Sequence, residues 1–364
     1  MVLPDLIIGD LKVKPPIIQG GMGVGVSLSG LASAVANEGG IGVISATGIG
    51  MHETDFEADF MGANKRILKV EIEKAKKMSN GIIGVNLMVA LSDYYDLFEV
   101  SFDMGVDVVF LGAGLPLKIP AGLTVEKLKS GVTKCIPIVS SARAANIIFK
   151  TWAKNYNHVP DAVVVEGPLA GGHLGFKPEQ IADPNYSLEN ILPEVVEVIK
   201  KYEETFNKKI PVIAGGGIFT GEDIFKIMQL GASGVQMGTR FVATDECDAS
   251  EKFKNAYIES SDEDMIIIKS PVGLPGRAIN NKFLSDIAAG KKQDFVCPCK
   301  CLHTCDFINA PYCIALALTN AKQGLLDDGF VFAGTNAPRV DRIISVKELM
   351  NTLQEEYSQA ASQG

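Results

Sequence analysis

Eight short apolar runs recur along the first 240 residues, and they constrain the fold more than any other feature of the chain. They span residues 17–21, 41–45, 82–89, 108–112, 136–140, 162–166, 211–215 and 234–238, and most of them end in Gly, Ser or Asn. Their apolar character is nearly continuous rather than alternating, which is typical of strands buried on both faces of a parallel sheet. The runs therefore predict eight parallel strands.

Helix-like segments separate many of these runs. They span residues 27–37, 63–78, 142–154, 188–206 and 221–230. Thr220 stands at the N-cap position of the last segment, with Glu222 and Asp223 in its first turn. Repeated alternation of buried strand and amphipathic helix predicts an α/β fold, a (β/α)8 TIM barrel, in preference to an open doubly wound sheet.

The alternation of strand and helix breaks after residue 243. We expect residues 1–243 to form the barrel and residues 244–328, which contain five of the seven cysteines, to form a smaller inserted lobe. Residues 329–364 are expected to return to the barrel and to end in a closing helix over residues 345–357. The fold predicted is thus a TIM barrel with a lobe inserted near the C-terminus.

Charge and composition exclude several classes of partner. The formal net charge of −9 disfavours nucleic acid or an anionic membrane. Residues 1–16 lack the basic start and apolar core of a signal peptide, and no run of about 18 apolar residues occurs. Seven cysteines, an odd number in a chain of this size, favour a reducing compartment over a disulfide scaffold. We expect a soluble, cytoplasmic protein.

The loops that follow the first and third strands carry candidate binding residues. Gly21, Met22 and Gly23 follow the first strand, and Asn86 lies towards the end of the third. Glycines let backbone amides approach a flat ring, and methionine offers a polarizable apolar surface. A plain tight turn is the alternative for this first loop.

The loop after the sixth strand carries the candidate catalytic residue, His173. The strand ends at Glu166 and Gly167, and Gly171 and Gly172 directly precede the histidine. An imidazole that titrates near neutrality suits proton transfer or charge stabilisation. The glycines around His173 favour a functional role over that of an ordinary loop histidine, which is the interpretation that we give to the other three histidines.

The loops after strands seven and eight predict a phosphate site. Barrels commonly bind phosphate with these two loops and a nearby helix N-terminus. Neither loop matches a Rossmann fingerprint or a Walker A sequence. Together with the other loops, this pattern predicts a phosphorylated cofactor, and FMN fits it. The residues concerned are Gly215, Gly216, Gly217, Gln236, Met237, Gly238 and Thr239.

In combination these motifs resemble the nitronate monooxygenase family, formerly called 2-nitropropane dioxygenases, over most of residues 1–245. The resemblance implies a barrel with a smaller lobe over the flavin, FMN as cofactor, and His173 as the active-site histidine. The motifs are shared with the flavin-dependent enoyl-acyl-carrier-protein reductases. Glu166 and Gly167 resemble the reductases, whereas Pro168 and Leu169 differ from the pair expected of a reductase.

Three functions are open, two of them implied by the resemblance and the third of a different class. The first is oxidation of an alkyl nitronate by FMN and dioxygen, with His173 stabilising the anionic nitro group or taking the α-proton of a neutral nitroalkane. The second is reduction of an enoyl thioester by NAD(P)H through FMN. The third is a flavin-binding subunit of a larger complex. We prefer the first, and the oligomeric state stays open.

Five cysteines are clustered in the expected lobe. Cys297, Cys299, Cys301, Cys305 and Cys313 have the density of a zinc or iron–sulfur site. Their spacing lacks the paired C-x2-C knuckles of common zinc sites and matches no ferredoxin pattern. The spacing therefore favours reduced thiols, and no metal is predicted.

Overall fold

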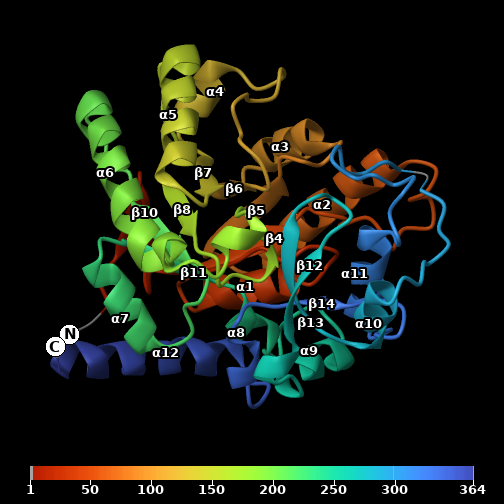
Figure 1. Cartoon of the computed structure of the whole chain (residues 1–364). Helices are drawn as coiled ribbons and strands as arrows, with labels where there is room; N and C mark the ends of the chain where they lie inside the picture. Colours follow the sequence, from red (N-terminus) through yellow and green to blue (C-terminus); the bar gives the residue numbers. More distant parts are fainter. Residues whose placement is uncertain (1–2, 298, 364) are drawn as a thin grey trace.

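The computed structural model describes residues 3–297 and 299–363, and its centre is a closed barrel of eight parallel strands (Figure 1). The barrel strands are β3 (Ile17–Gln19), β4 (Ile41–Ser45), β5 (Ile82–Met88), β6 (Val108–Gly112), β7 (Lys134–Val139), β8 (Val163–Glu166), β10 (Val212–Gly215) and β11 (Gly234–Met237). β8 pairs with β10, and β11 pairs with β3, which closes the ring. The predicted TIM barrel is confirmed, and every predicted strand lies within two residues of an observed one.

Helices follow the barrel strands and cover the outside of the ring. They are α1 (Ser29–Asn37), α2 (Phe60–Met78), α3 (Tyr94–Asp103), α4 (Val125–Lys129), α5 (Ala142–Tyr156), α6 (Leu188–Phe206), α7 (Gly221–Gln229) and α8 (Thr239–Val242). α7 begins at the predicted cap, where the Thr220 hydroxyl accepts from Asp223 N and the Asp223 carboxylate accepts from Thr220 N. This reciprocal capping satisfies amides that the helix itself leaves unpaired.

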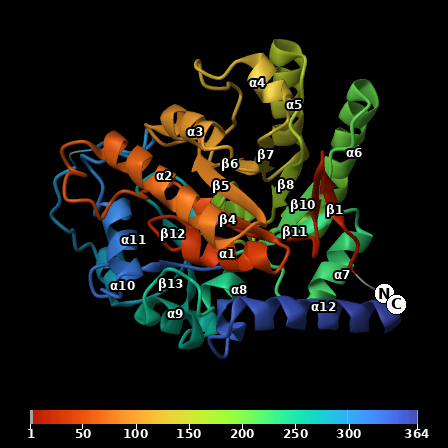
Figure 2. The same cartoon turned by 180° about the vertical axis from the view of Figure 1, so that it is seen from behind.

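A hairpin at the N-terminus closes the bottom of the barrel (Figure 2). Its strands β1 (Leu6–Ile8) and β2 (Leu11–Val13) are antiparallel. Leu6, Ile8 and Val13 are fully buried and pack on the side chains that fill the barrel interior, among them Ile18 and Phe110. This hairpin was not predicted from the sequence. Because it seals the amino ends of the strands, only their carboxyl ends are left to form a site.

A second, four-stranded sheet lies beside the barrel on the side opposite α5 and α6 (Figures 1 and 2). It contains β12 (Met265–Lys269), β13 (Pro275–Ile279), β14 (Val331–Phe332) and, from the loop after β8, β9 (Gly172–His173). The helices around it are α9 (Glu251–Ile258), α10 (Lys282–Ala288) and α11 (Ile314–Lys322). Residues 244–328 therefore share their sheet with segments on both sides of them in the chain.

The chain ends in α12 (Val346–Gln363), which runs along α7 (Figure 1). Gly221 N donates to the Glu356 carboxylate over 2.7 Å, and the Phe225 and Tyr357 rings meet edge to face. Short 3-10 turns complete the architecture: η1 (Pro178–Gln180), η2 (Pro184–Tyr186), η3 (Asp262–Asp264) and η4 (Ala337–Arg339). Among the described residues, no helix combines the length and apolarity needed to cross a bilayer.

Candidate active site

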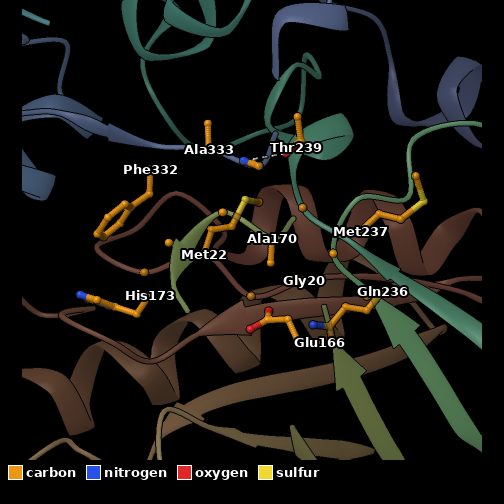
Figure 3. Close-up of a pocket in the computed structure, with 18 of the residues that line it drawn as sticks. Gly20, Met22, Glu166, Ala170, His173, Gln236, Met237, Thr239, Phe332 and Ala333 are labelled. Carbon is orange, nitrogen blue, oxygen red and sulfur yellow. Dashed lines mark hydrogen bonds between the residues drawn. The ribbon is translucent and has the colours of Figure 1, made fainter. Parts of the chain in front are cut away.

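A cavity of about 310 Å³ opens at the carboxyl ends of the barrel strands, and it brings the predicted site residues together (Figure 3). This volume is at the lower end of the range for ligand pockets. The predicted residues that line it are Gly21, Met22, Gly23, Asn86, Glu166, Gly171, Gly172, His173, Gly215, Gly216, Gly217, Gln236, Met237, Gly238 and Thr239.

Gly167 is the one predicted site residue that does not line this cavity. Its amide donates to Gly215 O over 2.8 Å. A Cβ at this position would lie 2.8 Å from the Leu188 Cβ, so Gly167 packs closely against Leu188. A Cβ on Gly216 would come within 2.8 Å of Gly167 O. Gly167 therefore supports the loop after β10 from behind.

The cavity wall formed by the loops after β10 and β11 consists largely of backbone. Gly216 and Gly217 have φ of +90° and +89°, a left-handed conformation that favours glycine. A Cβ on Gly238 would have no protein atom within 4 Å, so a side chain there would project into open space at the cavity. This wall presents main-chain groups to a ligand at close range.

The loop after β3 packs closely across β5. A Cβ on Gly21 would lie 2.3 Å from the Asn86 Cβ, which only glycine avoids. Met22 N donates to the Ser27 hydroxyl over 2.9 Å, and this bond holds the turn that presents the Met22 side chain to the cavity. The part of the wall next to the loop after β11 thus combines the apolar Met22 side chain with the polar Asn86 side chain.

His173 is positioned by the second sheet rather than by the barrel. β9 pairs with β13 so that His173 lies opposite Gly276, and Leu174 N donates to Pro275 O over 2.9 Å. The His173 Nε2 atom lies 2.8 Å from the hydroxyl of Ser270, a buried residue in the turn between β12 and β13. The Phe332 ring meets the imidazole edge to face, with centroids 5.0 Å apart (Figure 3).

Burial keeps the His173 imidazole neutral near physiological pH. Desolvation lowers its pKa to about 4, because the charged form loses water that the surrounding apolar groups do not replace. The neutral ring has one nitrogen that donates and one that accepts, and the Ser270 hydroxyl can pair with either tautomer. The group can therefore donate a hydrogen bond to an anion or accept a proton.

Arg277 fixes the loop that carries His173. Its guanidinium is buried and donates from one nitrogen to Pro168 O at 2.5 Å and to Ala170 O at 2.7 Å. Both carbonyls belong to the turn between β8 and β9. Bonds from a charged donor are stronger than neutral ones, so this contact ties the loop firmly to β13.

Glu166 lies at the base of the cavity. Burial raises its pKa to about 7, since no basic group or donor compensates the charged form. Figure 3 shows its carboxyl group and the Gln236 side chain on the same side of the cavity. Near pH 7 the carboxyl group is thus poised between its protonated and ionised forms.

Several cavity residues come from beyond residue 243 and were not predicted from the sequence. Tyr257 Oη donates to Phe332 O over 2.7 Å, and Asn336 Nδ2 donates to Gly217 O over 2.7 Å. Gly334 N donates to the Thr239 hydroxyl over 3.3 Å. No local motif marks them, because their role depends on contacts with residues 75 to 119 positions away in the chain. The missed residues after position 243 are Phe253, Tyr257, Leu318, Phe332, Ala333, Gly334 and Asn336.

Comparison with known proteins agrees with this architecture. A family model described as nitronate monooxygenase matches residues 5–356. A probable nitronate monooxygenase of Staphylococcus aureus (strain Newman) is 30% identical over 305 residues, which are 76% of this chain and 79% of that protein. The match thus covers most of that protein as well as most of this chain.

Two solved structures share the fold. FabK from Thermotoga maritima has a TM-score of 0.72 and 27% identity, and the match covers 96% of this chain and 94% of that one. A nitroalkane oxidase from Streptomyces ansochromogenes has a TM-score of 0.71 at 23% identity, over 96% and 97% of the two chains. The latter likeness supports the fold alone. Because the family model spans nearly the whole chain, the protein belongs to the nitronate monooxygenase family, a family of oxidoreductases.

Proposed function

We propose that this cavity binds FMN and that the protein oxidises alkyl nitronates with dioxygen. The fit to a flat, phosphorylated ligand rests on the glycine-lined walls. The phosphate group would be held by the amides of Gly215–Gly217 and by Gly238 and Thr239, where no side chain blocks approach. The flavin ring would lie against Met22 and Asn86, with Glu166 and Gln236 at the base.

His173 would handle the charge of the substrate. When bound, FMN supplies the redox chemistry of the reaction. A neutral imidazole can donate a hydrogen bond to an anionic nitro group, or it can take the α-proton of a neutral nitroalkane. Ser270 restrains the ring through the 2.8 Å contact, so the imidazole is oriented before the substrate arrives.

The observation that carries this proposal is His173, a half-buried histidine whose pKa is lowered to about 4 by desolvation, at a cavity walled largely by glycine backbone. Its Nε2 atom lies 2.8 Å from the Ser270 hydroxyl, so the imidazole is held in one orientation beside the space proposed for the flavin. A neutral imidazole held in this way suits an anionic substrate such as a nitronate.

Reduction of an enoyl thioester is the second candidate. It is favoured by Glu166, whose position at the end of β8 resembles the reductases, and by the likeness to FabK over 96% of the chain. In that reaction His173 would polarise or protonate the acyl group.

An anaerobic reduction experiment separates the two candidates. The purified protein is mixed separately with propyl nitronate, NADH and NADPH, and the flavin absorbance is followed. We expect bleaching by the nitronate and a slow response to either nicotinamide. Rapid bleaching by NADH or NADPH would instead establish the reductase, and a protein that takes up no FMN would overturn both.

A further inference from the structure

The cysteine segment, residues 289–313, connects α10 to α11 and contains five of the seven cysteines. Its described residues form only turns, bends and one isolated bridge, between Leu91 and Leu302. Few backbone hydrogen bonds secure it to the barrel: Ser92 N donates to Cys301 O over 3.0 Å, and His303 N donates to Ala90 O over 2.9 Å. Such a long irregular connection inside a compact fold is uncommon unless it is functional.

Four thiols of this segment surround one small cavity. The cavity measures about 20 Å³, and Phe295, Leu302, Phe307 and Ile314 provide its apolar walls. Cys299 is the one cysteine of the segment that does not line it. All five cysteines are free thiols. We call the four lining residues the cavity cysteines: Cys297, Cys301, Cys305 and Cys313.

The cavity cysteines share one small space and form no disulfide. Each of the four is half-buried. Thiols gathered at this density are the ligand set that soft metals prefer.

The cavity cysteines are not arranged around a single ion. Among the described residues, no group of three or more His, Cys, Asp and Glu side chains could hold one metal ion. A zinc ion would draw its sulfur ligands to about 2.3 Å from one centre. An iron–sulfur cluster attaches each thiolate to a different iron, so it fits cysteines that surround a common space at larger separation.

We propose that the cavity cysteines ligate a four-iron iron–sulfur cluster. Each iron–thiolate bond forms as one thiol loses its proton. The apolar walls would limit water access to the cluster, and Lys300, which also lines the cavity, would offset part of its negative charge. The cluster is larger than the present 20 Å³ cavity, so the segment must move outward to admit it. The described residues of the segment contain no helix or strand that this movement would break.

The proposed cluster would lie close to the active cavity. Cys313 is the N-cap residue of α11, and Leu318 of the same helix lines the active cavity. These residues are separated by about 7.5 Å along the helix axis, at 1.5 Å per residue. The inference concerns a site of its own and does not depend on the proposed nitronate chemistry.

Metal analysis of the whole protein tests the proposal. The protein is produced with iron supplementation and purified without oxygen, and iron, acid-labile sulfide and zinc are measured per chain. We expect about four iron and four sulfide per chain, and an electron paramagnetic resonance signal after dithionite reduction that a flavin radical does not produce. Absence of iron and sulfide, or one zinc per chain in their place, would overturn the proposal.

Paired serine variants locate the ligands. Cys301→Ser and Cys313→Ser should each lower iron and sulfide at least about fivefold, whereas Cys299→Ser, the matched control in the same segment, should retain them. FMN content and circular dichroism report whether each variant is folded. If a variant does not fold, the iron and sulfide content of the wild-type protein decides whether a cluster is bound. Equal iron loss in Cys299→Ser and Cys301→Ser would contradict the assignment.

Discussion

The two halves of the active cavity are built by different means. In the barrel half, the loops after β10 and β11 line the cavity with glycine backbone. The cavity stays open there because these glycines have no side chains to fill it. In the half that comes from the second sheet, Ser270, Arg277 and Phe332 hold His173 and its loop through side-chain contacts. Adding atoms should therefore damage the first half, and removing atoms should damage the second.

The largest effect is expected from removing the imidazole itself. His173→Ala should lower kcat/KM for nitronate by roughly 10²- to 10⁴-fold, because it deletes the group that exchanges a proton or a hydrogen bond with the substrate. FMN content should not change. Steady-state oxygen consumption and flavin absorbance measure the two quantities. His158→Ala, at a histidine that does not line the cavity, is the control; an equal loss there would refute the role of His173.

The next prediction concerns Glu166, at the base of the barrel half, and the pH dependence of the free energy of unfolding. Its pKa of about 7 in the folded protein exceeds the ordinary glutamate value of 4.5, so the folded state binds the proton more tightly than the unfolded chain. The resulting stability is fully present below pH 4.5 and is lost as pH rises through 7, by at most about 3 kcal/mol at 1.36 kcal/mol per pKa unit.

Glu166→Gln should remove this loss. Denaturant unfolding of the FMN-free protein between pH 5 and pH 8 measures it, and the variant should have a flatter profile than the wild type. If the two profiles run parallel, the burial of Glu166 does not control its protonation.

The next prediction concerns Gly238, where a substitution would add a side chain to the barrel half of the cavity. Gly238→Val should weaken FMN binding on the order of 100-fold, about 2.7 kcal/mol, because the new side chain would occupy the cavity. The Tm of the FMN-free protein should change little, since a Cβ there meets no protein atom within 4 Å. Fluorescence titration with FMN gives the Kd. Gly238→Ala should fall between the wild type and valine, and an unchanged Kd in both variants would exclude the proposed phosphate position.

Ser270 should give the smallest effect and tests the other half. Ser270→Ala deletes the hydroxyl that restrains His173, and a hydrogen bond of this kind contributes about 1 kcal/mol, or roughly fivefold in kcat/KM. FMN affinity should be unaffected, and the loss should disappear in a His173→Ala background. A Ser270→Ala effect that persists without His173 would show that the serine acts elsewhere.

Much of the fold could be predicted from the sequence because its signals are local. The run at residues 41–45 and the segment at residues 188–206 coincide with β4 and α6, since burial on both faces and amphipathic spacing are properties of neighbouring residues. The same holds for the glycine loops of the site. Gly216 and Gly217 are visible as glycines, and their left-handed backbone is what such a doublet permits.

The barrel strands, the glycine walls and the identity of the candidate histidine were determined by sequence alone. The tertiary structure decided what orients that histidine, because the pairing of β9 with β13 joins residues about 100 positions apart through backbone groups that every residue carries. It also decided that four of the five cysteines of the segment share a cavity, whereas spacing along the chain had favoured reduced thiols without a metal. Such contacts join residues far apart in the sequence, so they depend on the tertiary fold and cannot be predicted from a local pattern of residues.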